Sequence, residues 1–277
     1  MGKNIKMLNF RKMHGLGNDF VILDSRDQDL ALTPARVRAI GDRHFGVGFD
    51  QLVVLKTPNT DNVDLDIDFW NADGSMAGAC GNASRCIGKI IMDETGRDTA
   101  QFRTERGVLT AKRMGDDISV NMGQPQLTWD AVPLAYDCDL NHLPIEGDPG
   151  AAGMGNPHMV FVVDDVAAVP LSDIGHDLEH HPLFPEKTNV EFIQVLARDH
   201  IRMRVWERGG RITLACGSGA CAAAVVAHRR GLTERKVHMD LDGGPLTLDW
   251  RDDGIWMTGT TSLVFEGTFS REFLENT

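Results

Sequence analysis

The chain has 277 residues, enough for one large domain or two of ordinary size. Its formal net charge of −12 argues against an electrostatic nucleic-acid binder, because such proteins normally carry a basic patch. No apolar stretch approaches the roughly 20 residues of a membrane-spanning helix, and the first residues lack the apolar core of a secretory signal. We therefore expect a cytoplasmic protein with neither a nucleic-acid nor a membrane partner.

The first half of the chain carries a clear helix-start signal between apolar runs. Thr33 is followed by Pro34, an order typical of a helix N-cap and the first helical residue. The short apolar or alternating runs around it are typical of strands. In chain order, we expect a strand at 21–24, a helix from 34 to about 44, strands at 51–56 and 65–70, a helix at 83–92 and a β-rich run at 101–122.

Between residues 123 and 153, four prolines interrupt any regular pattern, so we expect a linker there. The same types of element then return in the same order. We expect a strand at 159–163, a helix from about 172, strands at 190–196 and 201–206, a helix at 220–230 and a β-rich run at 237–269.

The two halves also share sequence. The chain reads CGNASRCIGKIIM from Cys80 and CGSGACAAAVVAH from Cys216, about half the chain length further on. GNDFVILD in the first half likewise matches GNPHMVFVVD in the second, and FDQLVVL matches TNVEFIQVL. Landmarks in the same order predict two homologous halves, each with its own core. We expect an N-terminal half at 1–123, against which the C-terminal strand can pack, a linker region at 124–152 and a C-terminal half at 153–277.

Each repeated cysteine stands where a glycine-rich turn enters a predicted helix. Helix starts carry unpaired N–H groups and a partial positive charge, which favour a thiolate and so lower a cysteine pKa. The same N–H groups can bind a carboxylate. Two halves related by a pseudo-twofold axis would place one thiolate opposite one thiol, the arrangement that inverts a stereocentre by removing a proton from one face and returning one to the other. His158 and Glu207 are candidates for assisting these proton transfers.

Neither a metal centre nor a disulfide framework is indicated by the remaining cysteines and histidines. Cys86 and Cys221 follow the repeated cysteines without the CxxC spacing of zinc sites. Five cysteines, an odd number, fit reduced thiols, and only the repeated pair receives a catalytic role. His176, His180 and His181 are interpreted as a solvated helix face. We therefore expect no metal and no cofactor.

At these positions the sequence closely resembles the diaminopimelate epimerase family. The resemblance runs from residue 10 to about residue 269 and rests on blocks in the family's order: KMHGLGNDFVILD, HFGVGFDQL, NADGS with CGNASR, GNPH, TNVEF, and ERGG with ACGSGACA. It implies an α/β (α+β) fold of two pseudo-symmetric halves, each with a mixed β-sheet wrapped around a central helix. It also implies a homodimer that converts LL- to meso-diaminopimelate in lysine and peptidoglycan biosynthesis, without pyridoxal phosphate or metal.

Individual residues receive roles from the same resemblance. Cys80 and Cys216 match the acid/base pair. The amides that match the groups holding the substrate carboxylate are those of Gly81, Asn82, Gly217 and Ser218. The side chains that match the other substrate contacts or line the site are Asn18, Gln51, Asn71, Asn156, His158, Asn189, Glu207 and Arg208.

Two positions depart from the family pattern. Arg211 stands where the family usually has a turn glycine, and Ala79 precedes the first repeated cysteine where another residue is more usual. Neither change touches a residue with an implied role, so we expect the chemistry to be intact.

Four other functions compete with this interpretation. A proline or hydroxyproline racemase-type enzyme shares the two-cysteine logic but has no need for a clamp of asparagines and Arg208. An isomerase like the phenazine-biosynthesis proteins would use carboxylates, and a non-catalytic amino-acid-binding protein would not use paired thiols. A disulfide oxidoreductase is disfavoured because CxxC is absent.

Overall fold

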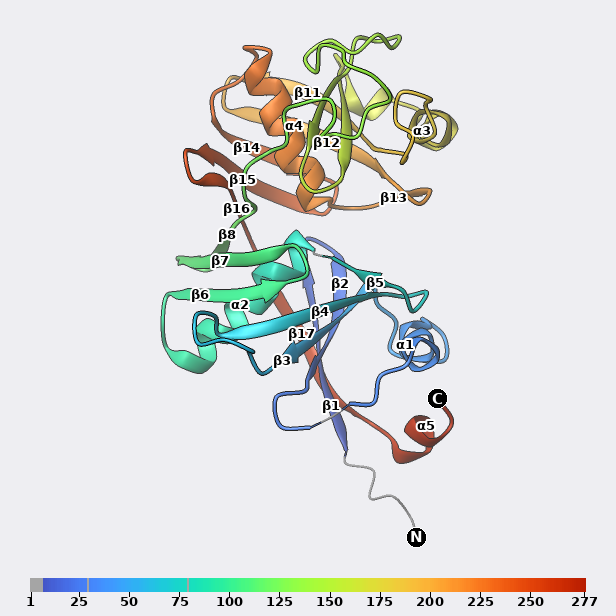
Figure 1. Ribbon diagram of the computed structural model, residues 1–277, viewed down its shortest axis with the longest axis vertical. Helices are drawn as coiled ribbons and strands as arrows, with labels where there is room; N and C mark the ends of the chain where they lie inside the picture. The colour runs from blue at the N-terminus through green and yellow to red at the C-terminus, as the bar shows by residue number, and fades with distance from the viewer. Residues whose placement is uncertain (1–6, 29, 79) are drawn as a thin grey trace. The chain divides into compact units, whose positions relative to one another are not determined.

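The structure, a computed structural model, describes residues 7–28, 30–78 and 80–277 and is drawn in Figure 1. The chain divides into two units. Unit 1 runs to Ile118 and includes the C-terminal segment Thr260–Thr277, whereas unit 2 is the continuous segment Ser119–Gly259. Ala79, one of the two departures from the family pattern, lies outside the described residues.

Unit 1 is built on a mixed sheet whose strands lie in the order β17-β1-β2-β3-β4-β6-β7. The β2–β3 and β4–β6 pairs are parallel, and the other pairs in this order are antiparallel. The elements are β1 (Leu8–Gly15), β2 (Asn18–Asp24), α1 (Pro34–Gly41), β3 (Gln51–Lys56), β4 (Leu65–Asn71), β5 (Met76–Ala77), α2 (Gly81–Thr95), β6 (Thr99–Thr104), β7 (Gly107–Met114), β17 (Ser262–Phe269) and α5 (Arg271–Glu275).

Unit 2 has a mixed sheet in the order β9-β10-β11-β12-β14-β15-β16-β8, with β10–β11 and β12–β14 parallel. The elements are β8 (Asp117–Asn121, which begins in unit 1), β9 (Gly150–Gly153), β10 (Pro157–Val162), the 3-10 turn η1 (Val166–Ala168), α3 (Leu171–Glu179), β11 (Asn189–Ala197), β12 (His200–Glu207), β13 (Arg211–Ile212), α4 (Gly217–Arg229), β14 (Lys236–Leu241), β15 (Gly244–Arg251) and β16 (Gly254–Gly259).

The two units repeat one topology, as the sequence predicted. The series β1-β2-α1-β3-β4-β5-α2-β6-β7 corresponds one for one to β9-β10-α3-β11-β12-β13-α4-β14-β15, and the parallel pairs fall at equivalent places. The expected fold, a mixed sheet with a central helix in each half, is confirmed.

In each unit, one helix is buried along most of its length against that unit's strands. Helix α2 contacts β1, β6 and β7, while α4 contacts β9, β10, β11, β15 and β16; Figure 1 draws α2 in teal and α4 in orange. Small residues allow this close packing. An ideal Cβ at Gly88 would lie only 2.6 Å from the Cβ of Ala111 on β7. In α4 the run Ala222–Ala223–Ala224 is buried and removes bulk in the same way.

Helix boundaries differ from the sequence-based expectations at the residues nearest the turns. Helix α1 ends at Gly41 rather than near residue 44, because the carboxylate of Asp42 accepts hydrogen bonds from the backbone amides of His44 and Phe45 in the following turn. Helices α2 and α4 begin at Gly81 and Gly217, earlier than expected. Glycine has a low helix propensity, so these starts were not recognised in the sequence. Strands β1 and β9 were not anticipated.

The unit boundaries also differ from the division at 1–123, 124–152 and 153–277. The segment expected as a linker packs onto unit 2, where Val132, Leu134, Leu140 and Leu143 join its apolar core. Its prolines prevent regular structure, but its apolar side chains are spaced closely enough to be buried. At the other end, the segment from Thr260 belongs to unit 1, in line with the allowance made for the C-terminal strand, because β17 pairs with β1 along most of its length. Among the described residues, no helix is both long and apolar enough to span a membrane.

Candidate active site

Cys80 is the N-cap residue of α2, with extended backbone angles of φ −148° and ψ 116°. Its half-buried side chain lies against the start of β2, where Sγ donates to Asn18 Oδ1 over 3.6 Å. Asn82, in the first turn of α2, donates from Nδ2 to the same oxygen over 3.2 Å. Three residues predicted for one site therefore meet around a single amide oxygen.

A charged network that the sequence analysis missed holds Asn18 in place. Asn18 Nδ2 donates to Asp50 Oδ2 over 2.8 Å, and Asp50 and Asp19 exchange backbone-to-carboxylate hydrogen bonds. Arg43 donates to both carboxylates, and Lys12 donates to Asp19. Burial opposes ionisation of Asp19, but the hydrogen bonds and charges of Arg43 and Lys12 outweigh it and lower its pKa to about 2. Asp19 is therefore anionic across the physiological pH range.

Gln51 and Asn71 face each other across the antiparallel strands β3 and β4. Gln51 Nε2 donates to Asn71 Oδ1 over 3.3 Å, and Asn71 Nδ2 donates to Ser75 Oγ over 3.0 Å. The predicted pair thus forms a small polar cluster beside the turn that leads toward Cys80.

The chain at the end of β1 approaches the first turn of α2 closely. An ideal Cβ at Gly15 would lie 2.9 Å from Arg85 Nη2 and 3.2 Å from the backbone oxygen of Asn82. Only glycine fits there. The first helical backbone bond runs from Ser84 N to Cys80 O, so the amides of the preceding turn, including that of Gly81, take no part in the helical ladder. This is the position implied for carboxylate binding.

Cys216 is the N-cap residue of α4 and is buried. Its Sγ accepts from Gly219 N over 3.4 Å and lies 3.6 Å from Ser218 Oγ. The hydrogen bonds at this helix start, from Gly219 N and Ser218 Oγ, lower the pKa of Cys216 but are outweighed. Burial, together with the negative charges of Glu207 and Glu191, raises the pKa of Cys216 well above its ordinary value. Cys216 therefore rests as a thiol.

Beside Cys216 lies a buried histidine–glutamate pair. His158 Nδ1 and Glu191 Oε1 are 2.7 Å apart, and both side chains are fully buried. His158 Nε2 lies 3.1 Å from Asn156 Oδ1. An ideal Cβ at Gly219 would lie 2.4 Å from Glu191 Oε1 and 3.2 Å from Cys216 Sγ, so α4 starts directly against the glutamate.

Asn189 anchors the loop that carries Arg208. It pairs in register with His158 on the parallel strand β10, and its Nδ2 donates to Pro157 O over 2.9 Å. Its Oδ1 accepts from Arg208 N over 3.0 Å, while Arg208 Nη1 donates to Glu186 O over 3.3 Å. The buried side chain of Asn189 thus fixes the backbone from which the exposed end of Arg208 projects.

Glu207 is held from the loop that follows β12. Its Oε1 accepts from Thr213 Oγ1, and Arg211 Nη2 lies 4.0 Å from Oε2. The positive φ values of this turn fall on Gly209 and Gly210, at 106° and 84°. Arg211 is therefore accommodated in the short strand β13 with an exposed side chain, without a left-handed backbone.

The predicted residues are thus divided between the two units, and in each unit several of them are in contact. Unit 1 contains Asn18, Gln51, Asn71, Cys80, Gly81 and Asn82, and unit 2 contains Asn156, His158, Asn189, Glu207, Arg208, Cys216, Gly217 and Ser218. Sequence reasoning missed Asp19, Asp50 and Glu191. A weak signal existed, because each lies within one or two residues of a predicted site residue in a mostly apolar strand region.

Solved structures with this fold include epimerase-type enzymes. The chain matches a hydroxyproline epimerase from Agrobacterium vitis with a TM-score of 0.69, 14% identity and coverage of 98% of this chain and 94% of that one. It matches a phenazine biosynthesis protein of the PhzF family from Bacillus anthracis with a TM-score of 0.68, 14% identity and coverage of 96% and 100%. The fold that this chain repeats in its two units is therefore shared with a protein named an epimerase and with a protein of phenazine biosynthesis.

Sequence comparison narrows this class to one family. The family model for diaminopimelate epimerase matches residues 10–128 and 150–264. A diaminopimelate epimerase from Rhodospirillum centenum is 50% identical over 96% of this chain and 93% of its own length. One from Gluconobacter oxydans is 51% identical over 94% and 98%. The chain belongs to the diaminopimelate epimerase family.

Proposed function

We propose that this protein interconverts LL-2,6-diaminopimelate and meso-diaminopimelate, using Cys80 and Cys216 as its two proton-transfer groups. The observation that carries the proposal is the cysteine at the start of the central helix in each unit. The family supports the substrate, since relatives that share about half of their residues with this chain bear the name diaminopimelate epimerase. The reaction would serve lysine and peptidoglycan biosynthesis.

The chemistry requires one thiolate and one thiol at a time. The thiolate takes the α-proton and becomes a thiol, while the electron pair left on carbon is delocalised into the substrate carboxylate. The other thiol donates its proton to the opposite face of the same carbon and becomes a thiolate. The raised pKa of Cys216 supports its starting one direction of the reaction as the acid. Neither pyridoxal phosphate nor a metal is needed in these steps.

Backbone amides would stabilise the charge that develops on the carboxylate. The first-turn amides at Gly81 and Asn82, and at Gly217 and Ser218, are the donors assigned to it. Arg208 suits the distal carboxylate, because a guanidinium can bind a carboxylate through two hydrogen bonds. The remaining polar contacts are assigned to Asn18, Gln51, Asn71, Asn156, Asn189 and Glu207, with His158 and Glu207 assisting proton transfer.

The test is incubation of the reduced protein with LL-diaminopimelate in deuterium oxide, followed by NMR and chiral chromatography. We expect meso product carrying deuterium at one α-carbon. Cys138→Ser is a matched control, since this half-buried cysteine has no assigned role. A folded protein with free thiols that yields neither exchange nor meso product would overturn the proposal. Parallel incubations with proline and hydroxyproline test the racemase-type alternative.

Quaternary state and location complete the proposal. A homodimer is supported by the exposed apolar run of Leu263, Val264 and Phe265 on β17, which a second copy could cover. Light scattering would show twice the chain mass for the protein and a lower mass for Val264→Asp. A cytoplasmic location is supported by the five cysteines, all of which are free thiols.

A further inference from the structure

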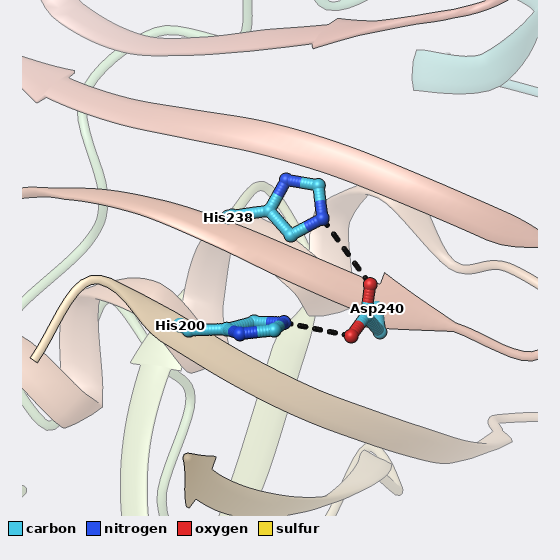
Figure 2. A group of neighbouring side chains, drawn as sticks. All are labelled: His200, His238 and Asp240. Atoms are coloured by element: carbon cyan, nitrogen blue, oxygen red, sulfur yellow. Dashed lines mark hydrogen bonds and ion pairs between the residues drawn. The ribbon is translucent and has the colours of Figure 1, made fainter. Parts of the chain in front are cut away.

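Two histidines and an aspartate converge on the surface of the unit 2 sheet, and none of them has a role in the proposed reaction. His200 Nε2 lies 2.7 Å from Asp240 Oδ2, and His238 Nε2 lies 3.2 Å from Asp240 Oδ1. One ligand atom from each residue falls within 4.8 Å of the others. Figure 2 shows both imidazoles directing a ring nitrogen at the same carboxylate.

Strand register explains why the three side chains meet. His200 and His238 are paired residues on the parallel strands β12 and β14. His238 and Asp240 are two residues apart on β14 and therefore share a face. Their neighbours Ile201 and Met239 point the other way and are fully buried, which anchors both strands. The donors thus project from a rigid sheet rather than from a loop.

We propose that His200, His238 and Asp240 form a binding site for one divalent transition-metal cation of the Zn²⁺ type. Two imidazole nitrogens and one carboxylate oxygen form a donor set that suits Zn²⁺, Ni²⁺ or Cu²⁺, whereas Mg²⁺ and Ca²⁺ prefer oxygen ligands. Zn²⁺ takes four ligands in a tetrahedron, so a water molecule would complete the site. The side chains are 36%, 48% and 40% exposed, which leaves the site open to ions from solution.

The neighbouring arginine leaves the Asp240 carboxylate to the two imidazoles. Arg202 is paired in register with Asp240, but its guanidinium donates to the carboxylate of Asp242 and to the backbone oxygens of Met203 and Asp240. Among the described residues, the Asp240 carboxylate is instead contacted by the two imidazoles. An incoming cation would therefore meet a carboxylate that is hydrogen-bonded rather than paired with arginine.

The test is a Zn²⁺ titration of the full chain by isothermal calorimetry, repeated with His238→Ala and Asp240→Asn. Cysteine thiolates also bind Zn²⁺, so the quantity compared is the number of equivalents that each variant loses. His176→Ala is the matched control, because it removes an exposed histidine on α3 outside the triad. We expect His238→Ala and Asp240→Asn to lose one equivalent of bound Zn²⁺ and His176→Ala to keep it. Co²⁺ serves as a spectroscopic substitute and should give a tetrahedral spectrum in which the lost equivalent lacks a thiolate charge-transfer band.

Removal of one ligand should weaken the binding of this Zn²⁺ equivalent by more than about tenfold, because even outer-shell partners of metal ligands contribute roughly 10- to 100-fold to metal affinity. Mg²⁺ should not compete. Unchanged stoichiometry and affinity in both triad variants would overturn the proposal, as would a spectrum from sulfur ligands alone. His200→Gln provides a further variant if either substitution unfolds the sheet.

A separate inference concerns the buried Glu191, and this inference rests on the function proposed above. Its Oε1 is occupied by His158, while Oε2 has no hydrogen-bond partner among the described residues, although the side chain is fully buried. A buried carboxylate without a full set of partners is costly to keep in a fold. The carboxylate lies against the start of α4, beside Cys216, and this position indicates a functional role for it.

We infer that Glu191 is a positioning residue that orients the His158 ring and keeps a negative charge beside Cys216. By accepting from Nδ1, the carboxylate fixes the ring so that Nε2 points toward Asn156. Its charge, together with that of Glu207, favours the protonated form of the thiol. The same side chain would thus control both the orientation of the His158 ring and the protonation state of Cys216.

Glu191→Gln keeps the shape of the side chain and removes its charge. We expect faster alkylation of Cys216 by iodoacetamide at neutral pH, by about tenfold for each unit of lost pKa, measured on the Cys216 peptide by mass spectrometry. Glu234→Gln, at an exposed glutamate of the same unit, is the control. Glu191→Asp keeps the charge but shortens the reach to His158, so kcat should fall while alkylation stays slow.

Alkylation rates that are identical in Glu191→Gln and the parent chain would overturn the inference. A parent chain that shows no substrate turnover would instead count against the proposed function. The alkylation rate does not depend on turnover, so it still tests the inference. The two failures are therefore distinguishable.

Discussion

At the scale of single residues, the two cysteines occupy equivalent positions in different electrostatic surroundings. Cys80 is half-buried and donates to an amide oxygen, whereas Cys216 is buried beside two glutamates. The sequence predicted the equivalence, because both cysteines follow the same glycine-rich pattern. It could not predict the difference, because Glu191 reaches Cys216 through strand pairing and not through proximity in the chain.

We expect Cys80→Ser and Cys216→Ser each to lower kcat for epimerisation by more than about 100-fold, since a positioned acid or base contributes roughly 10² to 10⁴. A hydroxyl is a far weaker acid than a thiol and cannot supply the same proton at neutral pH. Steady-state assays with LL-diaminopimelate measure the effect. Activity within a few-fold of the parent in either variant would exclude that cysteine as a proton-transfer group.

Asp19 gives a second prediction at this scale, concerning stability against pH. Its folded pKa, about 2, lies below the unfolded value of 3.8, so the stabilisation is complete above about pH 4 and is lost as the pH falls toward 2. The shift corresponds to about 2 kcal/mol, at 1.36 kcal/mol per pKa unit.

Urea unfolding at pH 5 and pH 2.5 measures this contribution. Asp19→Asn should lower the free energy of unfolding at pH 5 by at least about 2 kcal/mol, because it also leaves the buried Lys12 without its carboxylate partner. The difference from the parent chain should shrink at pH 2.5. Asp116→Asn in an exposed turn is the control and should show no such pH dependence. A constant difference at both pH values would contradict the assignment.

At the scale of elements, the site depends on how closely helix starts approach strands. The sequence predicted both central helices and the strands before them, because apolar periodicity and glycine-rich turns are local signals. It did not predict β1 or β9. In β1 the buried Lys12 and partly buried Arg11 disguise the alternation, and β9 consists only of glycine and alanine. Such strands are recognised by their partners, not by their own composition.

Gly219 offers a test of this close approach. Gly219→Ala would place a methyl group 2.4 Å from Glu191 Oε1 and 3.2 Å from Cys216 Sγ, so the glutamate or the helix start must move. We expect a loss of kcat of at least about tenfold, because small displacements at a reacting centre are costly. Ser172→Ala, an exposed change in the first turn of α3, is the control. Unchanged kinetics in Gly219→Ala would show that the approach is not needed.

At the scale of the whole molecule, the repeat was predictable, whereas the exact boundaries of the two units were not. Matching landmarks such as GNDF and GNPH identified two halves, and the structure confirms the shared topology. The C-terminal strand packs on the N-terminal half, as the sequence analysis allowed, because β17 pairs with β1 and because Phe269 and Leu274 join the core of unit 1. The position of this boundary, at Thr260, was not predicted. Pairing between strands about 250 residues apart leaves no local signal.

Removing residues 260–277 tests this organisation. The truncated chain should lose protection from hydrogen exchange throughout β1 and its neighbours in unit 1, because β1 loses a strand partner and the core loses Phe269 and Leu274. Strands of unit 2, such as β11, should keep their protection, since that unit ends at Gly259. Equal loss in both units would show that they unfold together, and no loss in unit 1 would show that β17 is dispensable.

The position of β17 also has a consequence for biosynthesis. A ribosome makes unit 1 first, yet the strand that completes it is the last to emerge from the exit tunnel. Unit 2 is continuous and can fold as soon as Gly259 is outside the exit tunnel. At that point the N-terminal segment of unit 1 still has one edge of β1 unpaired. The first-made half of this protein is thus the last to mature, and a nascent chain stalled before its final strand is open to proteases and chaperones at its N-terminal end.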